Sequence, residues 1–183
     1  MRIIGGEARG RRLKAPRGAG TRPTADRVRE TIFNILGQRL AGERVLDLYA
    51  GSGALALEAL SRGAASAVLV ERDREAARIC EENAEALGYR GRVQVVRADA
   101  LQALRQIGGV FDLIFIDPPY AEGPAASLEI LGASALVAPG GRVVAEHGKR
   151  DELAQIYGAL ACTDRRRFGD TAVSFYERTE EPA

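Results

Sequence analysis

The chain has 183 residues, of which 46% are hydrophobic and 28% are charged. This length and composition fit one folded domain with a full core and exclude a disordered chain. No apolar run approaches the ~20 residues of a membrane-spanning helix, and the start MRIIGGEARGRR lacks the apolar middle of a signal peptide, so a cytoplasmic protein is expected. Two distant cysteines, Cys80 and Cys162, and a single histidine, His147, predict neither a disulfide framework nor a metal site.

The net charge of +1 is unevenly distributed along the chain. Residues 1–30 contain nine Lys and Arg against three Asp and Glu, whereas the remaining residues contain 17 basic and 22 acidic side chains. A basic arm on a mildly acidic body favours a polyanionic partner such as nucleic acid, with a merely solvated terminal segment as the alternative.

Residues 1–42 are predicted to form a basic N-terminal extension packed on the core. RIIGG and RGRRLKA are short segments around glycine-rich turns and indicate a hairpin, and PRGAGTRP indicates a loop. TADRVRETIFNILGQRL has apolar residues at helical spacing, with Thr24 as the expected N-cap. Residues 43–183 are predicted to form the main domain.

Short apolar runs alternate with helical patterns from residue 44 onward. Strands are predicted at 44–49, 66–71, 92–97, 111–117 and 142–147, and helices near 54–62, 73–87, 99–106, 124–136 and 149–157. This alternation indicates a parallel sheet with helices on both faces. The runs 159–168 and 172–178 flank FGDT, a connection so short that it joins antiparallel strands. The prediction is an α/β fold with a seven-stranded, mostly parallel sheet and an antiparallel C-terminal hairpin.

The stretch VLDLYAGSGALALEAL (45–60) places a glycine turn between a strand and a helix. Gly51, Gly53 and Ala56 give the pattern G-x-G-x-x-A, which is compatible with a dinucleotide site or with a tight turn alone. Asp47 argues against pyrophosphate, because a carboxylate there repels phosphate and attracts an ammonium group. Acidic residues at two further strand ends, Glu71 and Asp99, suit a ribose and an adenine amino group. S-adenosylmethionine has these three groups and no phosphate, and is the predicted cofactor.

The run FDLIFIDPPY (111–120) ends a buried strand with a carboxylate and two prolines. An aromatic amine is a poor nucleophile, and acceptors that pull on its N–H bonds help it to attack a methyl group. Asp117 and the carbonyl of Pro118 offer such acceptors, held rigidly because proline fixes φ. Tyr120 offers a ring on which a base can stack.

Together, these motifs resemble those of class I S-adenosylmethionine-dependent methyltransferases, which have a Rossmann-like sheet. With RIIGG, RGRRL and RPTADRVRETIFNIL at the front, the chain to about residue 178 is similar to the RsmD family. The resemblance implies methylation of the exocyclic N2 of a guanine in 16S ribosomal RNA, within an assembling small ribosomal subunit. A monomer without a metal is expected. The expected cofactor-binding residues are Asp47, Tyr49, Gly51, Ser52, Gly53, Glu71, Arg72, Asp99 and Ala100. Asp117, Pro118 and Tyr120 are the expected catalytic residues, and Arg9, Arg11, Arg12, Lys14, Arg22 and Arg29 the expected RNA-binding residues.

Other functions stay open at this point. An adenine-N6 or DNA methyltransferase has the same fold and similar DPPY motifs, although the two adjacent donors of guanine suit an acceptor-only carboxylate better. The glycine pattern permits a nicotinamide-dependent oxidoreductase, which Asp47 disfavours, and a non-catalytic RNA-binding module would not need the acidic strand ends. Glu146 and His147 are expected at the same sheet edge, where the single histidine suggests a general base that amine methylation does not require. Glu58 and Arg62, four residues apart on a helix, are expected to form a surface ion pair.

Overall fold

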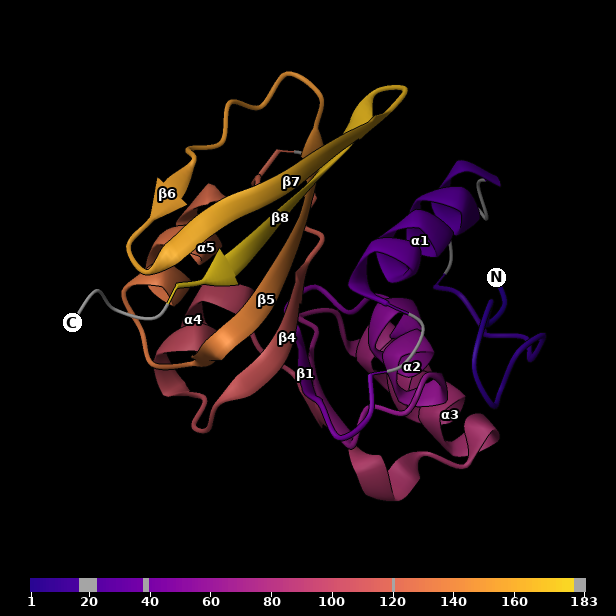
Figure 1. Ribbon diagram of the computed structural model, residues 1–183. Coiled ribbons are helices and arrows are strands. Elements are labelled where there is room, and N and C mark those ends of the chain that lie inside the picture. The colour runs from indigo at the N-terminus through magenta and orange to yellow at the C-terminus, as the bar shows by residue number, and fades with distance from the viewer. Residues whose placement is uncertain (17–22, 38–39, 120, 180–183) are drawn as a thin grey trace.

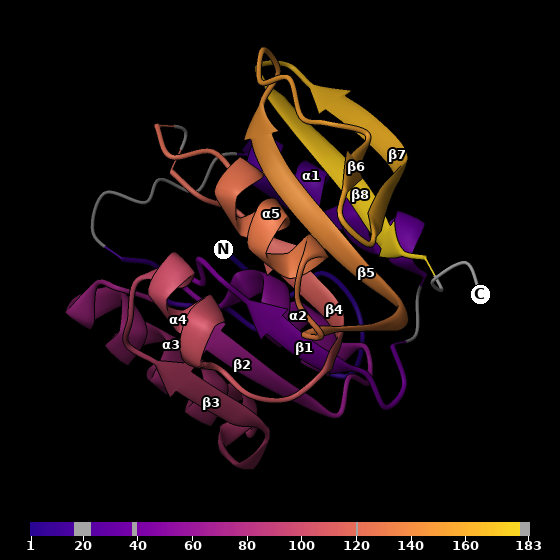
Figure 2. The ribbon, with the colours of Figure 1, turned by 90° about the vertical axis from the view of Figure 1, so that its left-hand side faces the viewer.

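The computed structural model describes residues 1–16, 23–37, 40–119 and 121–179, with the backbone alone for residues 23–25. Its centre is an eight-stranded sheet in the order β3-β2-β1-β4-β5-β8-β7-β6 (Figures 1 and 2). The first five in this order are parallel, and β8, β7 and β6 continue the sheet in antiparallel fashion. The strands are β1 Arg44–Asp47, β2 Ser66–Val70, β3 Val93–Val96, β4 Phe111–Ile116, β5 Val137–Gly148, β6 Ile156–Tyr157, β7 Leu160–Phe168 and β8 Thr171–Arg178.

Helices cover both faces of the sheet, as Figures 1 and 2 show. On one face lie α1 Pro23–Leu36, α2 Ala54–Ser61 and α3 Arg74–Leu87, and on the other lie α4 Ala100–Gln106 and α5 Ala125–Gly132, with a short 3-10 helix at Arg90–Arg92. Each face has its own apolar core, because the side chains of a strand alternate between the two. On the α1 face, the ring of Phe33 packs on that of Phe115 with centroids 5.8 Å apart. The predicted α/β class and the antiparallel end are confirmed.

The prediction is wrong at the eighth strand and at the helix expected over 149–157. There the chain forms a loop and the short strand β6, which pairs with β7. Asp151 accepts the N–H of Gly148 at 2.9 Å, and the hydroxyl of Tyr176 donates to the carbonyl of Ala154 at 2.8 Å. These bonds satisfy backbone and side-chain groups outside a helix, so tertiary contacts override the local helical propensity.

The N-terminal segment forms the expected antiparallel hairpin, although its pairing is too short to count as two strands. Among the residues described there, a single antiparallel bridge joins Arg2 and Arg12, and the N–H of Ile3 donates to the carbonyl of Arg11 at 2.9 Å. The hairpin lies beside α2 and α3 (Figure 1). The side chain of Thr24, the predicted N-cap of α1, is outside the described part of the chain. No described helix is long and apolar enough to cross a membrane.

Candidate active site

Two adjoining cavities open at the carboxyl ends of the parallel strands, where sheets of this kind bind ligands. The first, which we call the β2 cavity, has a volume of about 370 Å³ and is lined by residues that include Tyr49, Glu71, Asp99 and Asp117. The second, the α1 cavity, has a volume of about 260 Å³ and is lined by residues that include Asp47, Tyr49, Asp117 and Glu146. Tyr49 and Asp117 line both, so the two cavities form one site.

The glycine turn after β1 forms part of the wall of the α1 cavity. Gly51 and Gly53 have φ values of 56° and 78°, which favour glycine over any other residue. A Cβ atom on Gly53 would lie 2.9 Å from a methyl group of Leu69, whereas one on Gly51 would meet nothing within 4 Å. Packing therefore requires glycine at 53, and the space beside Gly51 is open to a ligand.

Glu71 fixes the turn from the end of β2. Its two carboxylate oxygens accept the backbone N–H groups of Gly51 and Asp73, both at 2.8 Å. Each oxygen accepts one such bond and has a lone pair left, so Glu71 can still accept hydroxyl groups of a ligand in the β2 cavity.

Asn83 of α3 is a residue of this region that the sequence analysis missed. Its side-chain amide donates to the carbonyls of Ser52 and Lys14 at 2.9 and 3.0 Å and accepts the N–H of Lys14 at 2.8 Å. These bonds join the glycine turn to the N-terminal segment, and Asn83 is buried between them at 2% exposure. The sequence signal is a lone amide on the apolar face of an amphipathic helix.

Asp47 is buried without a partner. It is 1% exposed, and neither carboxylate oxygen has a hydrogen bond to a described residue. Burial raises the pKa of Asp47 to about 7, and the negative charge of Asp117 adds to the shift, while the backbone N–H dipoles of Ala56 and Tyr49 oppose it. An unpartnered buried carboxylate is costly in a folded protein. Its position at the α1 cavity therefore suits a cationic group such as an ammonium.

Two further carboxylates, Asp117 and Glu146, line the α1 cavity. Asp117 directly follows β4; solvent reaches it through the cavities although protein groups surround it, and this partial desolvation raises its pKa to about 6. The pKa of Glu146 on β5 is raised to about 8 by burial and by the charge of Asp117. Neither carboxylate forms a hydrogen bond or ion pair with a described residue, and the described side chains form no cluster that could hold a metal ion.

The structure brings most of the other predicted cofactor residues to the same site. The hydroxyl of Tyr49 lies 3.4 Å from that of Ser127, and Arg72 forms an ion pair of 2.8 Å with Glu122. Asp99 is the N-cap of α4 and accepts two backbone N–H groups, which leaves its second oxygen for a ligand. Ala100 and Pro118 line the β2 cavity, Ser52 lines the α1 cavity, and Tyr120 lies outside the described residues.

His147 lines neither cavity and is 3% exposed. Its Nε2 lies 2.9 Å from the hydroxyl of Ser174, and its Nδ1 lies 2.9 Å from the carbonyl oxygen of Gly148. Burial lowers its pKa below the ordinary value. His147 is therefore a core side chain on the opposite face of β5 from Glu146, and the structure gives it no role as a base.

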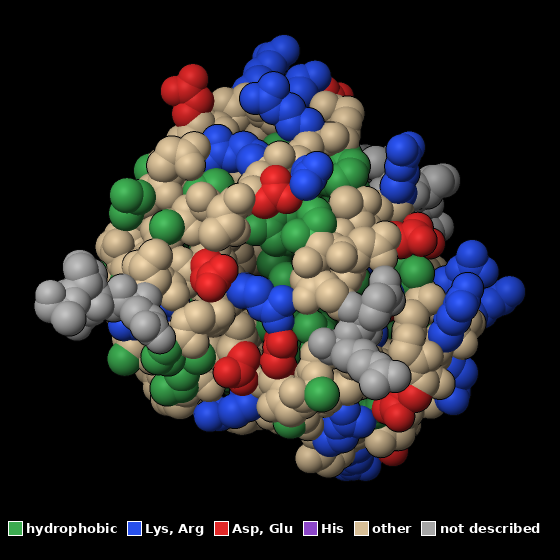
Figure 3. Space-filling model, viewed as in Figure 1, with side chains coloured by type: hydrophobic (Ala, Val, Ile, Leu, Met, Phe, Trp, Pro, Cys, Tyr) green, Lys and Arg blue, Asp and Glu red, His purple; other side chains and the backbone are tan. Residues whose placement is uncertain are grey.

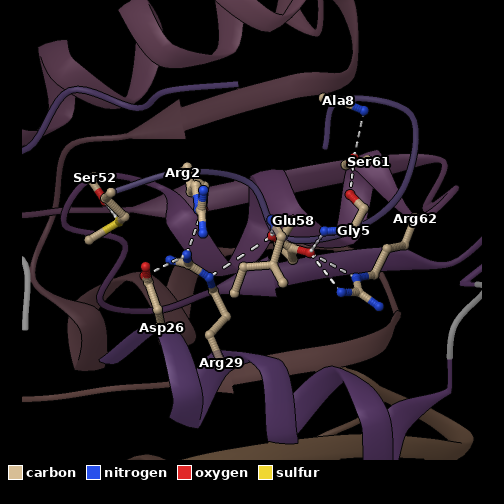
Figure 4. Close-up of polar contacts among 11 residues, drawn as sticks. Arg2, Gly5, Ala8, Asp26, Arg29, Ser52, Glu58, Ser61 and Arg62 are labelled. Carbon is tan, nitrogen blue, oxygen red and sulfur yellow. Dashed lines mark hydrogen bonds and ion pairs between the residues drawn. The ribbon is translucent and has the colours of Figure 1, made fainter. Parts of the chain in front are cut away.

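Arg29 is buried, and its predicted contact with RNA phosphate is wrong for this structure. The side chain is 5% exposed and donates to the carbonyl of Arg2 at 2.6 Å and to Asp26 at 3.0 Å (Figure 4). A guanidinium enclosed in this way cannot reach a phosphate on the surface. Arg29 instead lines the α1 cavity.

The other predicted RNA-binding residues lie on the N-terminal segment, where Lys and Arg gather at the right-hand edge of the face in Figure 3. Arg9 and Arg12 are exposed. Arg11 donates to the carbonyl of Ala86, and Lys14 forms an ion pair of 2.9 Å with Glu82. Arg22 is outside the described residues.

Glu58 is buried at the centre of a polar network, which corrects the predicted surface pair with Arg62. It is 0% exposed and accepts the backbone N–H groups of Ile4 and Gly5, each at 2.7 Å. Arg62 donates to the same carboxylate through two nitrogens at 2.9 and 2.8 Å (Figure 4). Ser61 adds bonds to the carbonyl of Gly5 at 2.6 Å and the N–H of Ala8 at 2.9 Å. The network fastens the N-terminal segment to α2, beside the glycine turn.

Solved structures share this architecture. The candidate methyltransferase yhhF of Escherichia coli matches with a TM-score of 0.88 at 37% identity, over 98% of each chain. The fold and its paired cavities at the strand ends thus define a protein of the class I methyltransferase type.

The family can also be named. The family model described as Conserved hypothetical protein 95 matches residues 1–177, and the chain belongs to this family, the RsmD family. It is 41% identical to the candidate rRNA methyltransferase YlbH of Bacillus subtilis, over 97% of this chain and 99% of that protein. It is 47% identical to ribosomal RNA small subunit methyltransferase D of Escherichia coli K12, over 67% of this chain and 62% of that protein.

Proposed function

We propose that this protein transfers a methyl group from S-adenosylmethionine to the exocyclic N2 of a guanine in 16S ribosomal RNA of the small subunit. The names of the relatives support an rRNA methyltransferase, and that of the Escherichia coli relative specifies the small subunit. The observation that carries the proposal is a pair of carboxylates in the α1 cavity: Asp47, which is buried with no hydrogen bond to a described residue, and Asp117, which lines both cavities. Asp47 suits the cationic cofactor, and Asp117 suits the amine of the target base.

The residues present fit S-adenosylmethionine, which when bound supplies an electrophilic methyl group on a sulfonium. Asp47 would hold the ammonium group, because it is buried and has no hydrogen bond to a described residue. Glu71 and Asp99 would accept the ribose hydroxyls and the adenine amino group in the β2 cavity. Because nothing lies within 4 Å of the position of a Cβ atom on Gly51, the ligand can approach the backbone of this turn closely without a clash.

Asp117 would then hold the target amine. An ionised carboxylate accepts hydrogen bonds only, and guanine presents N1–H and N2–H side by side. Adenine presents one donor and one acceptor there, which suits an amide better and makes an adenine-N6 enzyme the second candidate. The exposed Arg9 and Arg12 would contact the RNA backbone, where such contacts position without reading sequence.

The test is methylation of RNA by the purified protein with labelled S-adenosylmethionine. Small-subunit particles and naked 16S RNA from a strain that lacks this modification are the two substrates, and nucleosides are identified by mass spectrometry. We expect N2-methylguanosine from the particles. N6-methyladenosine would favour the second candidate, and no label in either RNA would refute a function on 16S RNA.

Asp117→Asn is the matched variant, because it keeps the size of the side chain and removes its charge. We expect kcat to fall roughly 10²–10³-fold, as when one preorganised group is lost from an active site. Binding of S-adenosylhomocysteine should remain. Unchanged turnover of the guanine would contradict the role given to Asp117.

A further inference from the structure

Glu146 lies beside Asp117 at the edge of the sheet where the cavities open. Ala145 of β5 is the register partner of Ile116 of β4, so the two acids follow paired residues on adjacent parallel strands. Both line the α1 cavity, as does Asp47 from β1. Successive side chains of a strand point to opposite faces, and His147 is turned to Ser174 on the other side.

Glu146 has no partner among the described residues. Its carboxylate forms no hydrogen bond or ion pair with any residue the structure describes, although the residue is half-buried. The described residues with charged groups that line the same cavity are Asp47 from β1, Asp117 after β4, Arg29 from α1 and Met1 with its α-amino group, together with the phenol of Tyr49. Arg29 is engaged by Asp26 and by the carbonyl of Arg2. Three acids therefore line one cavity, and none of them forms an ion pair with a described cation that lines it, an arrangement that suits a ligand rich in N–H donors.

We infer that Glu146 is a second catalytic carboxylate, which binds the target amine together with Asp117 and shares in taking up the proton that methylation releases. This inference rests on the proposed function, in which the substrate is a primary aromatic amine. Such an amine has two N–H bonds. With one directed to Asp117 and the other to Glu146, the nitrogen lone pair is left to face the methyl group.

The step balances in atoms and charge. The lone pair of the amine forms the bond to the methyl carbon as the sulfur–methyl bond breaks, and the electrons of that bond stay on sulfur as a neutral thioether. The nitrogen becomes positively charged and loses one of its two protons to the Asp117–Glu146 pair, which passes it to solvent. The product is a neutral secondary amine.

A pair of neighbouring carboxylates releases its protons in two steps, because the second negative charge forms beside the first. Partial desolvation raises the pKa of Asp117 to about 6, and burial with the charge of Asp117 raises that of Glu146 to about 8. The pair thus retains about one proton at neutral pH, and kcat should rise with pH across this range as acceptors are freed.

The experiment compares Glu146→Gln with the wild-type enzyme on the same RNA particles. We expect kcat to fall roughly 10²-fold, the scale of a lost proton acceptor, with the Kd of S-adenosylhomocysteine changed less than about twofold. The rise of kcat with pH should also move to lower pH, because Asp117 is then the one member of the pair that titrates. Glu152→Gln, which changes an exposed carboxylate in the following loop, is the matched control and should behave as wild type.

Glu146→Asp keeps a carboxylate and provides the second variant. It is expected to retain the higher-pH part of the profile, which a purely structural role would not predict. The inference is overturned if Glu146→Gln keeps the wild-type kcat and pH profile, or if cofactor affinity and kcat fall together in both variants. A wild-type product of N6-methyladenosine would instead overturn the guanine assignment, and the comparison of Glu146 variants would then apply to that amine.

Discussion

Replacing Glu58 by alanine should destabilise the protein more than the loss of any surface charge. The carboxylate is fully buried and accepts four hydrogen bonds, two from the backbone of Ile4 and Gly5 and two from Arg62. Its removal leaves the buried guanidinium of Arg62 without this partner, and breaking a buried pair from one side costs about 3–5 kcal/mol. The N–H groups of Ile4 and Gly5 can be hydrated by water if the N-terminal segment detaches, so the loss of their bonds adds no further cost to this free energy. At about 2–4 °C per kcal/mol for a chain of this size, Tm should fall by roughly 6–20 °C.

The assay is urea denaturation followed by circular dichroism, with hydrogen exchange at Ile4 and Gly5 to detect detachment of the segment. Glu85→Ala is the matched control, because Glu85 forms an ion pair with Arg90 in which both side chains are well exposed. Such surface pairs contribute about 0–1 kcal/mol. If Glu58→Ala lies within about 1 kcal/mol of wild type, or if Glu85→Ala loses as much, the network does not stabilise the fold as argued.

Three further predictions follow from the site and the arm. The pKa of Asp47 in the folded protein, about 7, lies above the ordinary 3.8, so ionisation of Asp47 destabilises the fold as pH rises between these values. Asp47→Asn should therefore stabilise the ligand-free protein above pH 7 by up to about 4 kcal/mol, which thermal melts over pH 4–8 would measure. The same variant should bind S-adenosylhomocysteine more weakly, as measured by calorimetry. Gly53→Ala should cost more stability than Gly88→Ala, because both have positive φ but only Gly53 packs closely on a leucine; equal losses would mean that φ alone decides. Replacing Arg9 and Arg12 by alanine should weaken RNA binding and flatten its logarithmic salt dependence by about 1.5, with cofactor affinity unchanged, and an unaltered slope would exclude them from the RNA interface.

The sequence was sufficient to predict the sheet, because its parallel strands are short apolar runs separated by helical patterns. It was also sufficient to predict that Asp47, Glu71, Asp99 and Asp117 lie close together, since parallel strands end at one edge of a sheet. The helix expected over 149–157 failed for a tertiary reason. Its residues are good helix formers, but the hydrogen bond from Tyr176 to Ala154 and the pairing of β6 with β7 stabilise a non-helical conformation there.

The environment of individual charges was harder to predict, because it depends on what covers them. An acid and an arginine four residues apart look the same on an exposed helix and on a buried one. Glu58 interrupts a helix whose other residues are apolar or small, ALALEALS, and in retrospect this composition indicates a buried partner. Nothing local indicates that the partners include backbone groups of residues 4 and 5. The burial of Arg29 could not be predicted for the same reason, because it depends on contact with the N-terminal segment at Arg2.

The N-terminal segment therefore belongs to the site as much as to any RNA surface. Met1 lines the α1 cavity and accepts a contact of 3.4 Å from the hydroxyl of Ser52, while Asn83 holds Lys14 and the glycine turn together. A boundary at residue 42 stays a prediction from composition, but these contacts argue against two independent folding units. Without the segment, Glu58 would lose two donors and the α1 cavity would lose part of its wall. If RNA contacts the exposed Arg9 and Arg12 as proposed, it binds the same segment that Asn83 joins to the glycine turn, so the proposed RNA surface and the proposed cofactor site share one set of contacts.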